Sequence, residues 1–233
     1  MRSHTSVLEM QTLCRNTMAY LTNVIRPGIA LTEIRRLAEE FMQANGADSF
    51  WYHGVGAMVY GGTDTALSQS GRDYVTADRI LGENDILTVD LSPQHSGHWG
   101  DFARTWILQD GKLVTDAAEV QNEQWRAGLE AEKNLHDLLW AAATPETTFA
   151  ELHRILTARI ASLGFENADF RGNLGHSIAA RPEDRIFIEP GNERRLSSVS
   201  AFTLEPHIRR PGSSYGFKWE NIYRFDGRSV DVV

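Results

Sequence analysis

Four acidic side chains and one histidine lie in segments that are otherwise apolar or glycine-containing, and this constrains the fold more than any other feature. An unpaired charge is costly to bury in such a segment, so these side chains must meet one another or a counter-charge. Four carboxylates carry −4 and two divalent cations carry +4, so the set is neutral only when both cations bind. We therefore expect the five residues to converge on a two-metal site. They are Asp90 in ILTVDLS, Asp101 in WGDFARTW, His176 in NLGHSIAA, Glu205 in FTLEPHI and Glu220 in KWENIYRF.

The composition is that of a soluble globular protein. Of the 233 residues, 42% are apolar and 23% are charged, which is an ordinary balance. The net charge of −8 disfavours nucleic acid or a membrane as the main partner, because both reward clustered Lys and Arg. Cys14 is the single cysteine, and we find neither an apolar signal segment nor a stretch of membrane-spanning length. We expect a cytoplasmic protein.

A weak internal repeat is present. Each copy reads as a helix that follows a proline turn and ends at a glycine. In the second copy, Thr148 and Glu151 predict a capping box at the helix start. With Pro27 placed on Pro145, all matched pairs share an offset of 118 residues. The other pairs are Glu33 on Glu151, Ile34 on Leu152, Leu37 on Ile155 and Gly46 on Gly164.

The repeat predicts the architecture. An amphipathic helix precedes each copy, at about residues 6–24 and 116–142, and strand-like residues follow each copy. We therefore expect an α+β chain forming one domain over residues 1–233. Its halves, about 1–115 and 116–233, would each be α-α-β-β units around a shared sheet. Two unrelated helical hairpins are the alternative.

The first two candidate ligands lie on a predicted hairpin. Residues 85–91 (DILTVDL) are apolar and β-branched, and residues 97–108 follow them after a turn-rich stretch. Such a pattern is typical of two antiparallel strands. The hairpin would bring Asp90 close to Asp101.

A second hairpin is predicted near the C-terminus. Residues 202–208 and 219–225 are strand-like, and the turn-rich RRPGSSYG joins them. This pairing would bring Glu205 close to Glu220. Two hairpins with two carboxylates each, together with the imidazole of His176, would make a compact, oxygen-rich site.

The order Asp, Asp, His, Glu, Glu on strands resembles the M24 "pita-bread" metallopeptidases, which include methionine aminopeptidase, Xaa-Pro aminopeptidase and prolidase. GDFART resembles the family's G-D-hydrophobic-T-R-T, LGHSI resembles GHGIG, and FTLEP resembles FTIEP. A VDL segment ends near the first Asp, and WENIYRF resembles the closing IED strand. The similarity spans essentially the whole chain. It implies the pita-bread fold, with two pseudo-symmetric halves around a curved antiparallel sheet.

The resemblance also implies roles for the five residues. Asp90 and Asp101 would bind one metal ion. Asp101 and Glu220 would bridge that ion to a second one, and His176 and Glu205 would complete the ligand set of the second ion. This ligand set suits Mn²⁺, Fe²⁺ or Co²⁺ and tolerates Zn²⁺. We expect Glu205 to be the catalytic residue that carries a proton to the leaving nitrogen, because it would touch both metal and water.

The residues expected to face the substrate differ from the family pattern. When aligned backwards from Asp90, the family's substrate-facing histidine falls on Asp73, and the second family histidine falls on Glu183. Two added carboxylates would favour a substrate with an amine or guanidinium group. Alternatively, both are surface residues on loops, and His53 or His207 takes the place of a missing histidine. We assign Asp73, Glu183 and His53 as candidate substrate-binding residues.

The leading hypothesis is a dinuclear metal-dependent hydrolase of the aminopeptidase type. It would hydrolyse an amide or C–N bond of a small peptide or amino-acid derivative. One alternative is a divergent small-molecule enzyme of the same fold, and another is a non-catalytic peptide-binding module. Many members of the family are dimers, so the resemblance also suggests a homodimer.

Overall fold

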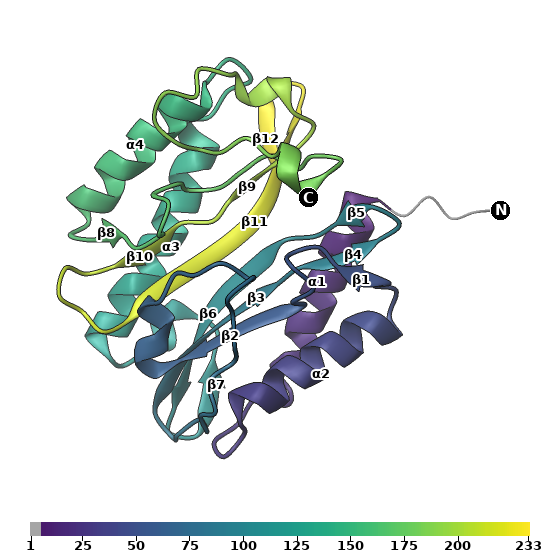
Figure 1. Ribbon diagram of the computed structural model, residues 1–233. Helices are drawn as coiled ribbons and strands as arrows, with labels where there is room; N and C mark the ends of the chain where they lie inside the picture. The colour runs from purple at the N-terminus through teal and green to yellow at the C-terminus, as the bar shows by residue number, and fades with distance from the viewer. Residues whose placement is uncertain (1–5) are drawn as a thin grey trace.

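Helices and strands follow one another in two similar groups along the chain (Figure 1). The computed structural model describes residues 6–233, and residues 1–5, at the start of the stretch searched for a signal segment, lie outside it. The helices are α1 (Val7–Leu21), α2 (Leu31–Ala44), α3 (Glu123–Ala142) and α4 (Phe149–Ser162), with short 3₁₀ helices η1 (Gly62–Ala66), η2 (Ala117–Glu119), η3 (Pro182–Asp184) and η4 (Leu196–Ser198). The strands are β1 (Ser49–Phe50), β2 (Ala57–Gly61), β3 (Asp85–Leu91), β4 (Pro93–His95), β5 (His98–Trp99), β6 (Phe102–Gln109), β7 (Lys112–Val114), β8 (Glu166–Asn167), β9 (Phe202–Leu204), β10 (His207–Arg209), β11 (Gly216–Asp226) and β12 (Ser229–Val232).

Helices α1, α3 and α4 begin at a side chain that accepts a free backbone N–H. Ser6 caps α1 in a complete capping box, and Asn122 accepts from the first amides of α3. Thr148 accepts from the amide of Glu151 at the start of α4, which is one of the two hydrogen bonds of the expected capping box. The expected start of α3 near residue 116 is wrong, because residues 117–119 form η2 and the α-helix begins only after the Asn122 cap.

One antiparallel sheet runs through the molecule in the order β2-β3-β6-β11-β10-β8, with β7, β9 and β12 paired to its strands. A small second sheet has the order β1-β4-β5. Strand β11, drawn in yellow in Figure 1, joins the two halves of the chain. It pairs with β6 of the first half on one side and with β9, β10 and β12 of the second half.

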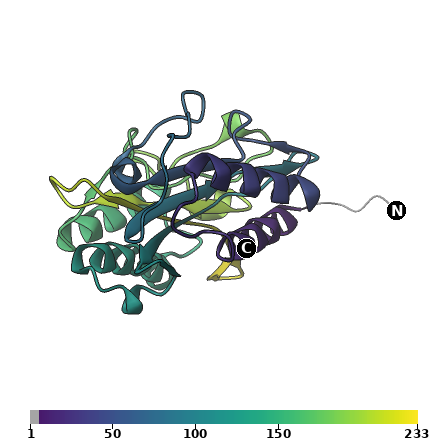
Figure 2. The same cartoon turned by 90° about the horizontal axis from the view of Figure 1, so that it is seen from below.

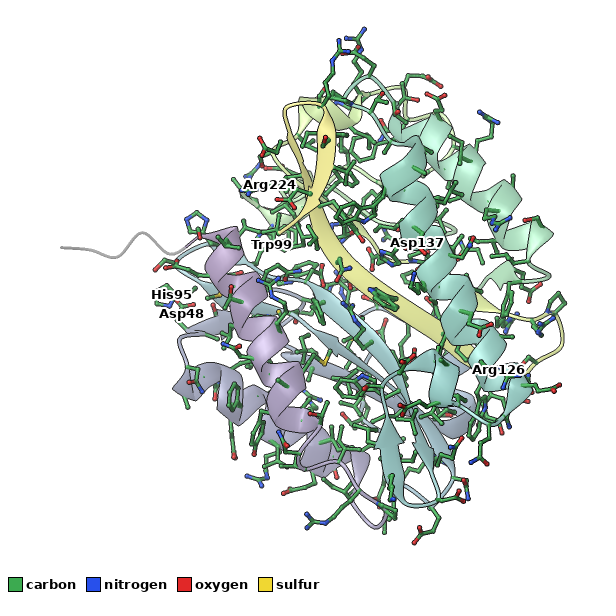
Figure 3. The ribbon with its side chains drawn as sticks, turned by 180° about the vertical axis from the view of Figure 1, so that it is seen from behind. Asp48, His95, Trp99, Arg126, Asp137 and Arg224 are labelled. Carbon is green, nitrogen blue, oxygen red and sulfur yellow. The ribbon has the colours of Figure 1, made fainter. Side chains whose placement is uncertain are left out.

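The helices form two pairs, α1 with α2 and α3 with α4. Figures 1 and 2 both place the first pair at one side of the molecule and the second pair at the other. Seen from behind, α1 and α3 lie over the same face of the sheet (Figure 3). The two largest hydrophobic cores lie one beneath each pair, with Ile34 and Leu152 fully buried at matching positions.

The structure reproduces the sequence repeat. Both ends of α4 follow those of α2 by 118 residues, since 149 − 31 and 162 − 44 give the same number. Ala30 and Thr148, the residues before these helices, each form an isolated antiparallel bridge to a later segment. Gly46 and Gly164 follow the helices with positive φ, a conformation that glycine adopts readily. The two α-α-β-β halves and the antiparallel sheet are as expected, whereas the domain limits and the boundary near residue 115 stay predictions.

Both predicted hairpins form, each with a difference. Strand β3 pairs with β6 along its whole length, but β4 and β5 lie in the turn between them. The strand predicted over residues 202–208 is divided into β9 and β10, which both pair with β11. The break falls at Glu205 and Pro206, because proline has no N–H to donate to the sheet. No helix within residues 6–233 is long and apolar enough to cross a membrane.

Candidate metal centre

The register of the sheet brings Asp90 and Glu220 together. Asp90 on β3 is opposite Ala103 on β6, and Ala103 is opposite Glu220 on β11. Directly opposed residues point to the same face of a sheet, so the two carboxylates flank a small alanine. Asp101 lies two residues before Ala103, and its backbone makes two hydrogen bonds with the Gln11 side chain of α1. Three of the predicted ligands therefore lie on, or directly before, the three consecutive strands β3, β6 and β11.

His176 and Glu205 close the site from the second half. The Nε2 atom of His176 lies 3.4 Å from Oδ2 of Asp101 and 3.4 Å from Oε1 of Glu205. The backbone of His176 pairs with Thr203, which fixes the imidazole beside β9. Gly175 allows this approach, because a Cβ atom there would overlap the carbonyl oxygen of Thr203.

The residues present fit a divalent ion. One ligand atom each from Asp101, His176 and Glu220 lie within 4.8 Å of one another, and all three side chains are buried. Both carboxylate oxygens of Glu220 are buried and have no hydrogen-bond partner among residues 6–233. Buried polar atoms are rarely left unpaired in folded proteins, and a cation would satisfy them. Glu205 can supply a fourth ligand, since it contacts the same imidazole.

A lysine that we did not predict lies in the middle of the site. The Nζ atom of Lys218 is 2.6 Å from Oδ2 of Asp90, 3.1 Å from Oε2 of Glu205 and 3.6 Å from Oε2 of Glu220. Lys218 precedes Glu220 by two residues on β11, so both side chains point to the same face. Its positive charge changes the balance on which the two-ion expectation rested.

Burial and neighbouring charges shift the pKa values of the cluster. Burial raises the pKa of Asp101 to about 6 although His176 opposes the rise. Burial, and then Asp101 and Glu205, raise the pKa of Glu220 well above its usual range. Burial also acts on Glu205, but Lys218 and His176 outweigh it and lower its pKa. Burial would lower the pKa of Lys218, yet the surrounding carboxylates raise it well above its ordinary value, so Lys218 is protonated.

The cluster opens into a cavity of about 170 Å³. Asp90, Asp101, His176, Glu205 and Lys218 line its inner part. Its wall combines aromatic and polar side chains and includes two arginines and Asp169. The wall residues used below are Trp51, His53, Phe187, Arg171, Arg185 and His207. A metal site at the end of such a cavity can meet a small substrate that enters from solvent.

Comparison with known proteins decides the family. The model of "Metallopeptidase family M24" matches residues 6–225. The chain belongs to metallopeptidase family M24. A methionine aminopeptidase from Helicobacter pylori is 26% identical over 207 residues, which cover 84% of this chain and 75% of that protein. The family expected from the sequence is therefore confirmed.

Solved structures of the family confirm the pita-bread fold. Prolidase from Pyrococcus furiosus superposes with a TM-score of 0.77 at 22% identity, covering 97% of this chain and 61% of the prolidase. Methionine aminopeptidase from Thermotoga maritima superposes with a TM-score of 0.75 at 15% identity, covering 96% of this chain and 93% of the aminopeptidase. The chain thus spans about three fifths of the prolidase. The family match together with this fold supports a metal-dependent hydrolase of the aminopeptidase type.

Two of the three residues predicted to face substrate in this M24 protein do not line the cavity. The side chain of Glu183 is 66% exposed, on η3, and lies 3.8 Å from Arg181. Asp73 is exposed because its neighbour Tyr74 occupies the interior, where its hydroxyl bonds to the backbone of Val59. Their assignment to the substrate site is corrected accordingly, and the surface-loop alternative describes them.

Outside the ligand cluster, the charged wall residues of the cavity are Arg171, Arg185 and Asp169. The Nη1 atom of Arg185 lies 3.3 Å from Nε2 of His176, and its guanidinium lies over the ring of Trp51 at 4.7 Å. Arg171 lies 5.9 Å from the ring of Phe187. Two arginines and one aspartate give this wall a net positive charge, which is opposite in sign to the charge expected from Asp73 and Glu183.

Two histidines also line the cavity. His53 does so from a loop before β2, with φ at +56°. His207 is buried, and its Nε2 atom lies 2.7 Å from the carbonyl oxygen of Thr65, so this nitrogen donates. Burial lowers the pKa of His207 to about 4, which keeps it neutral. In contrast, His95 lies beside Asp48 at the edge of the molecule (Figure 3) and is not part of the cavity wall.

Proposed function

We propose that this chain is a metal-dependent hydrolase that cleaves an amide bond of a small peptide or amino-acid derivative. One observation carries the proposal. Asp101, His176, Glu205 and Glu220, from four separate segments, converge at the inner end of a cavity. The M24 relatives named methionine aminopeptidase and prolidase support this reaction class.

A bound divalent ion would supply Lewis acidity for amide hydrolysis. The hard oxygen donors of the cluster favour Mn²⁺, Fe²⁺ or Co²⁺. Glu205 would supply the proton transfer. Its Oε1 atom faces His176, its Oε2 atom faces Lys218, and the side chain lines the cavity. Because its pKa lies below the ordinary value, Glu205 is ionised near neutral pH and can accept a proton from a water molecule and deliver it to the leaving nitrogen.

The cavity wall supports a substrate that carries a carboxylate. Arg185 and Arg171 both present guanidinium groups there, and arginine binds carboxylates through paired hydrogen bonds,. Neutral His207 offers its second ring nitrogen as a hydrogen-bond acceptor. These groups replace the amine-binding role that we had expected of Asp73 and Glu183. A cytoplasmic location and a homodimer remain predictions from the sequence.

A second candidate function is a divergent small-molecule hydrolase of the same fold. The specific observation that favours it is Lys218, which places a fixed positive charge among the candidate ligands. In that case the cleaved bond would belong to an N-acyl amino acid rather than to a peptide.

A substrate screen tests the proposal and separates the two candidates. Chelator-treated protein reloaded with Mn²⁺ is assayed on Met-Xaa and Xaa-Pro dipeptides and on N-acyl amino acids. We expect turnover that disappears with chelator and returns with Mn²⁺. Turnover of N-acyl amino acids alone supports the divergent enzyme. Failure to bind Mn²⁺, with no turnover of any substrate, contradicts both candidates and favours a binding module.

A further inference from the structure

The acidic cluster has two cation positions, and only one of them is open. One position lies between Asp101, His176 and Glu220, with Glu205 at its edge. The other lies between Asp90, Glu205 and Glu220, and the ammonium group of Lys218 fills it. The two positions share Glu205 and Glu220.

The backbone of Lys218 is held firmly at this point. Its N–H donates to Oγ1 of Thr105 at 2.9 Å, and its carbonyl oxygen accepts from the same hydroxyl at 3.2 Å. Thr105 is in turn hydrogen-bonded to Thr88 on β3 at 2.8 Å. Glu220, two residues later, is fully buried in the same strand. The strand therefore directs the lysine side chain into the cluster.

We propose that Lys218 replaces one of the two metal ions, so that the chain binds a single divalent ion. Asp101, His176, Glu205 and Glu220 hold that ion, and Asp90 serves as the partner of Lys218. Lys218 is a positioning residue, because its contact with Oε2 of Glu205 orients this carboxylate toward His176. This inference rests on the proposed function, since it assumes a metal-dependent site.

The room beside Asp90 and Glu205 limits the number of bound metal ions more strictly than the net charge of the cluster does. Four carboxylates and Lys218 leave a net charge of −1 with one divalent ion and +1 with two, so charge alone does not choose. A divalent transition metal ion sits about 2.0–2.2 Å from its carboxylate oxygens. The ammonium nitrogen already lies 2.6 Å from Asp90 and 3.1 Å from Glu205. A second ion bound to the same two oxygens would overlap it.

The test counts metal ions in the full chain. Chelator-treated protein is equilibrated with excess Mn²⁺, free ions are removed by gel filtration, and the bound metal is measured by mass spectrometry. Electron paramagnetic resonance then distinguishes an isolated Mn²⁺ from an exchange-coupled pair. We compare wild type with Lys218→Met, which keeps the length of the side chain and removes its charge. Lys112→Met, at an exposed lysine on β7, is the matched control.

We expect one isolated ion in wild type and in Lys112→Met, and two coupled ions in Lys218→Met. Two ions in wild type, or one ion in folded Lys218→Met, would overturn the inference and leave the proposed function intact. No bound ion in wild type would contradict the proposed function itself. If Lys218→Met does not fold, Asp90→Asn provides the second variant. We expect Asp90→Asn to keep its single metal ion, because Asp90 pairs with Lys218 and does not hold the ion. Loss of the ion in this variant would overturn the inference.

Discussion

The ammonium group of Lys218 lies 2.6 Å from the carboxylate of Asp90, within a cluster of four acidic side chains. The two residues come from β11 and β3, which are separated in the sheet by β6. Without a bound metal ion, Lys218 is the nearest counter-charge for Asp90 and Glu205. Part of the stability of the metal-free protein therefore depends on this one side chain.

Replacing Lys218 by methionine should destabilise the metal-free protein. Removing one partner of a largely buried ion pair typically costs about 3–5 kcal/mol, because the other charge is left uncompensated. We expect a loss of about 3 kcal/mol in the free energy of unfolding, measured by urea denaturation in chelator. Excess Mn²⁺ should restore most of that loss in Lys218→Met. An equal loss with and without Mn²⁺ would show that Lys218 acts through packing alone, and Lys112→Met should stay within about 0.5 kcal/mol of wild type.

Replacing Glu205 by glutamine should abolish proton transfer and leave the fold unchanged. General acid–base catalysis contributes about 10²- to 10⁴-fold in rate, so we expect kcat to fall by that factor. The measurement is steady-state turnover at saturating Mn²⁺, with circular dichroism as the check on folding. Glu183→Gln is the control, because Glu183 is exposed outside the cavity and should change kcat by less than about twofold,. Unchanged kcat in Glu205→Gln would remove Glu205 from the mechanism.

Replacing Arg185 by methionine should weaken the binding of substrates that carry a carboxylate. A hydrogen bond to a charged group contributes about 1.5–3 kcal/mol, which corresponds to roughly a 10- to 100-fold rise in KM. The same substrate with its carboxylate amidated should show no such rise. Arg181→Met is the control, since Arg181 is exposed and paired with Asp184. A KM that rises equally for both substrates would show that Arg185 supports the wall rather than the carboxylate.

Replacing Gly175 by alanine should disrupt the metal centre. A Cβ atom there would overlap the carbonyl oxygen of Thr203, and Gly175 has φ at +146°. Overpacking and a strained backbone each cost about 1–3 kcal/mol, so we expect a loss of about 3 kcal/mol and weaker binding of Mn²⁺. Gly172→Ala is matched to it, because Gly172 also has positive φ but open space around it. Equal effects in the two variants would contradict a role for close packing beside His176.

The buried His136 should make the protein sensitive to acid. Burial lowers its pKa to about 3, and its ring bonds to the hydroxyl of Tyr223 and the carbonyl of Trp219. The unfolded chain takes up a proton at this histidine below about pH 6.5 and the folded chain does not, so stability falls as the pH drops from 6.5 toward 3. The slope is about 1.4 kcal/mol per pH unit.

A variant isolates the contribution of His136. Between pH 7 and pH 5, the stability advantage of wild type over His136→Gln should shrink by about 2 kcal/mol, as measured by urea denaturation. His98→Gln, at an exposed histidine on β5, should show no such change. A constant difference between wild type and His136→Gln would show that His136 is not held neutral by the fold.

The fold, and the way the sheet brings Asp90 and Glu220 to one face, could be predicted because both depend on regular periodicity. The apolar strands around Asp90 and Glu220 predict pairing, and pairing predicts which side chains share a face. The helices that start at Leu31 and Phe149 carry a matching pattern of buried positions. Such patterns survive low sequence identity, because they follow from burial and hydrogen bonding rather than from particular residues.

The substrate side was predicted less well, because it is built from loops. Asp73 and Glu183 were placed by counting along segments without regular periodicity, and both proved to be exposed. Arg185 lines the cavity because of the way a loop folds. No local sequence pattern predicts that fold. The position of Lys218 could have been predicted from the sequence, since a residue two positions before Glu220 on a strand must share its face.

The most direct test of the account is a crystal structure of the chain soaked in Mn²⁺, with an anomalous difference map at the manganese edge. We expect one peak, contacted by Asp101, His176, Glu205 and Glu220, with Lys218 still bonded to Asp90. The absence of any manganese peak in the cavity would contradict the claim that these side chains form a metal centre.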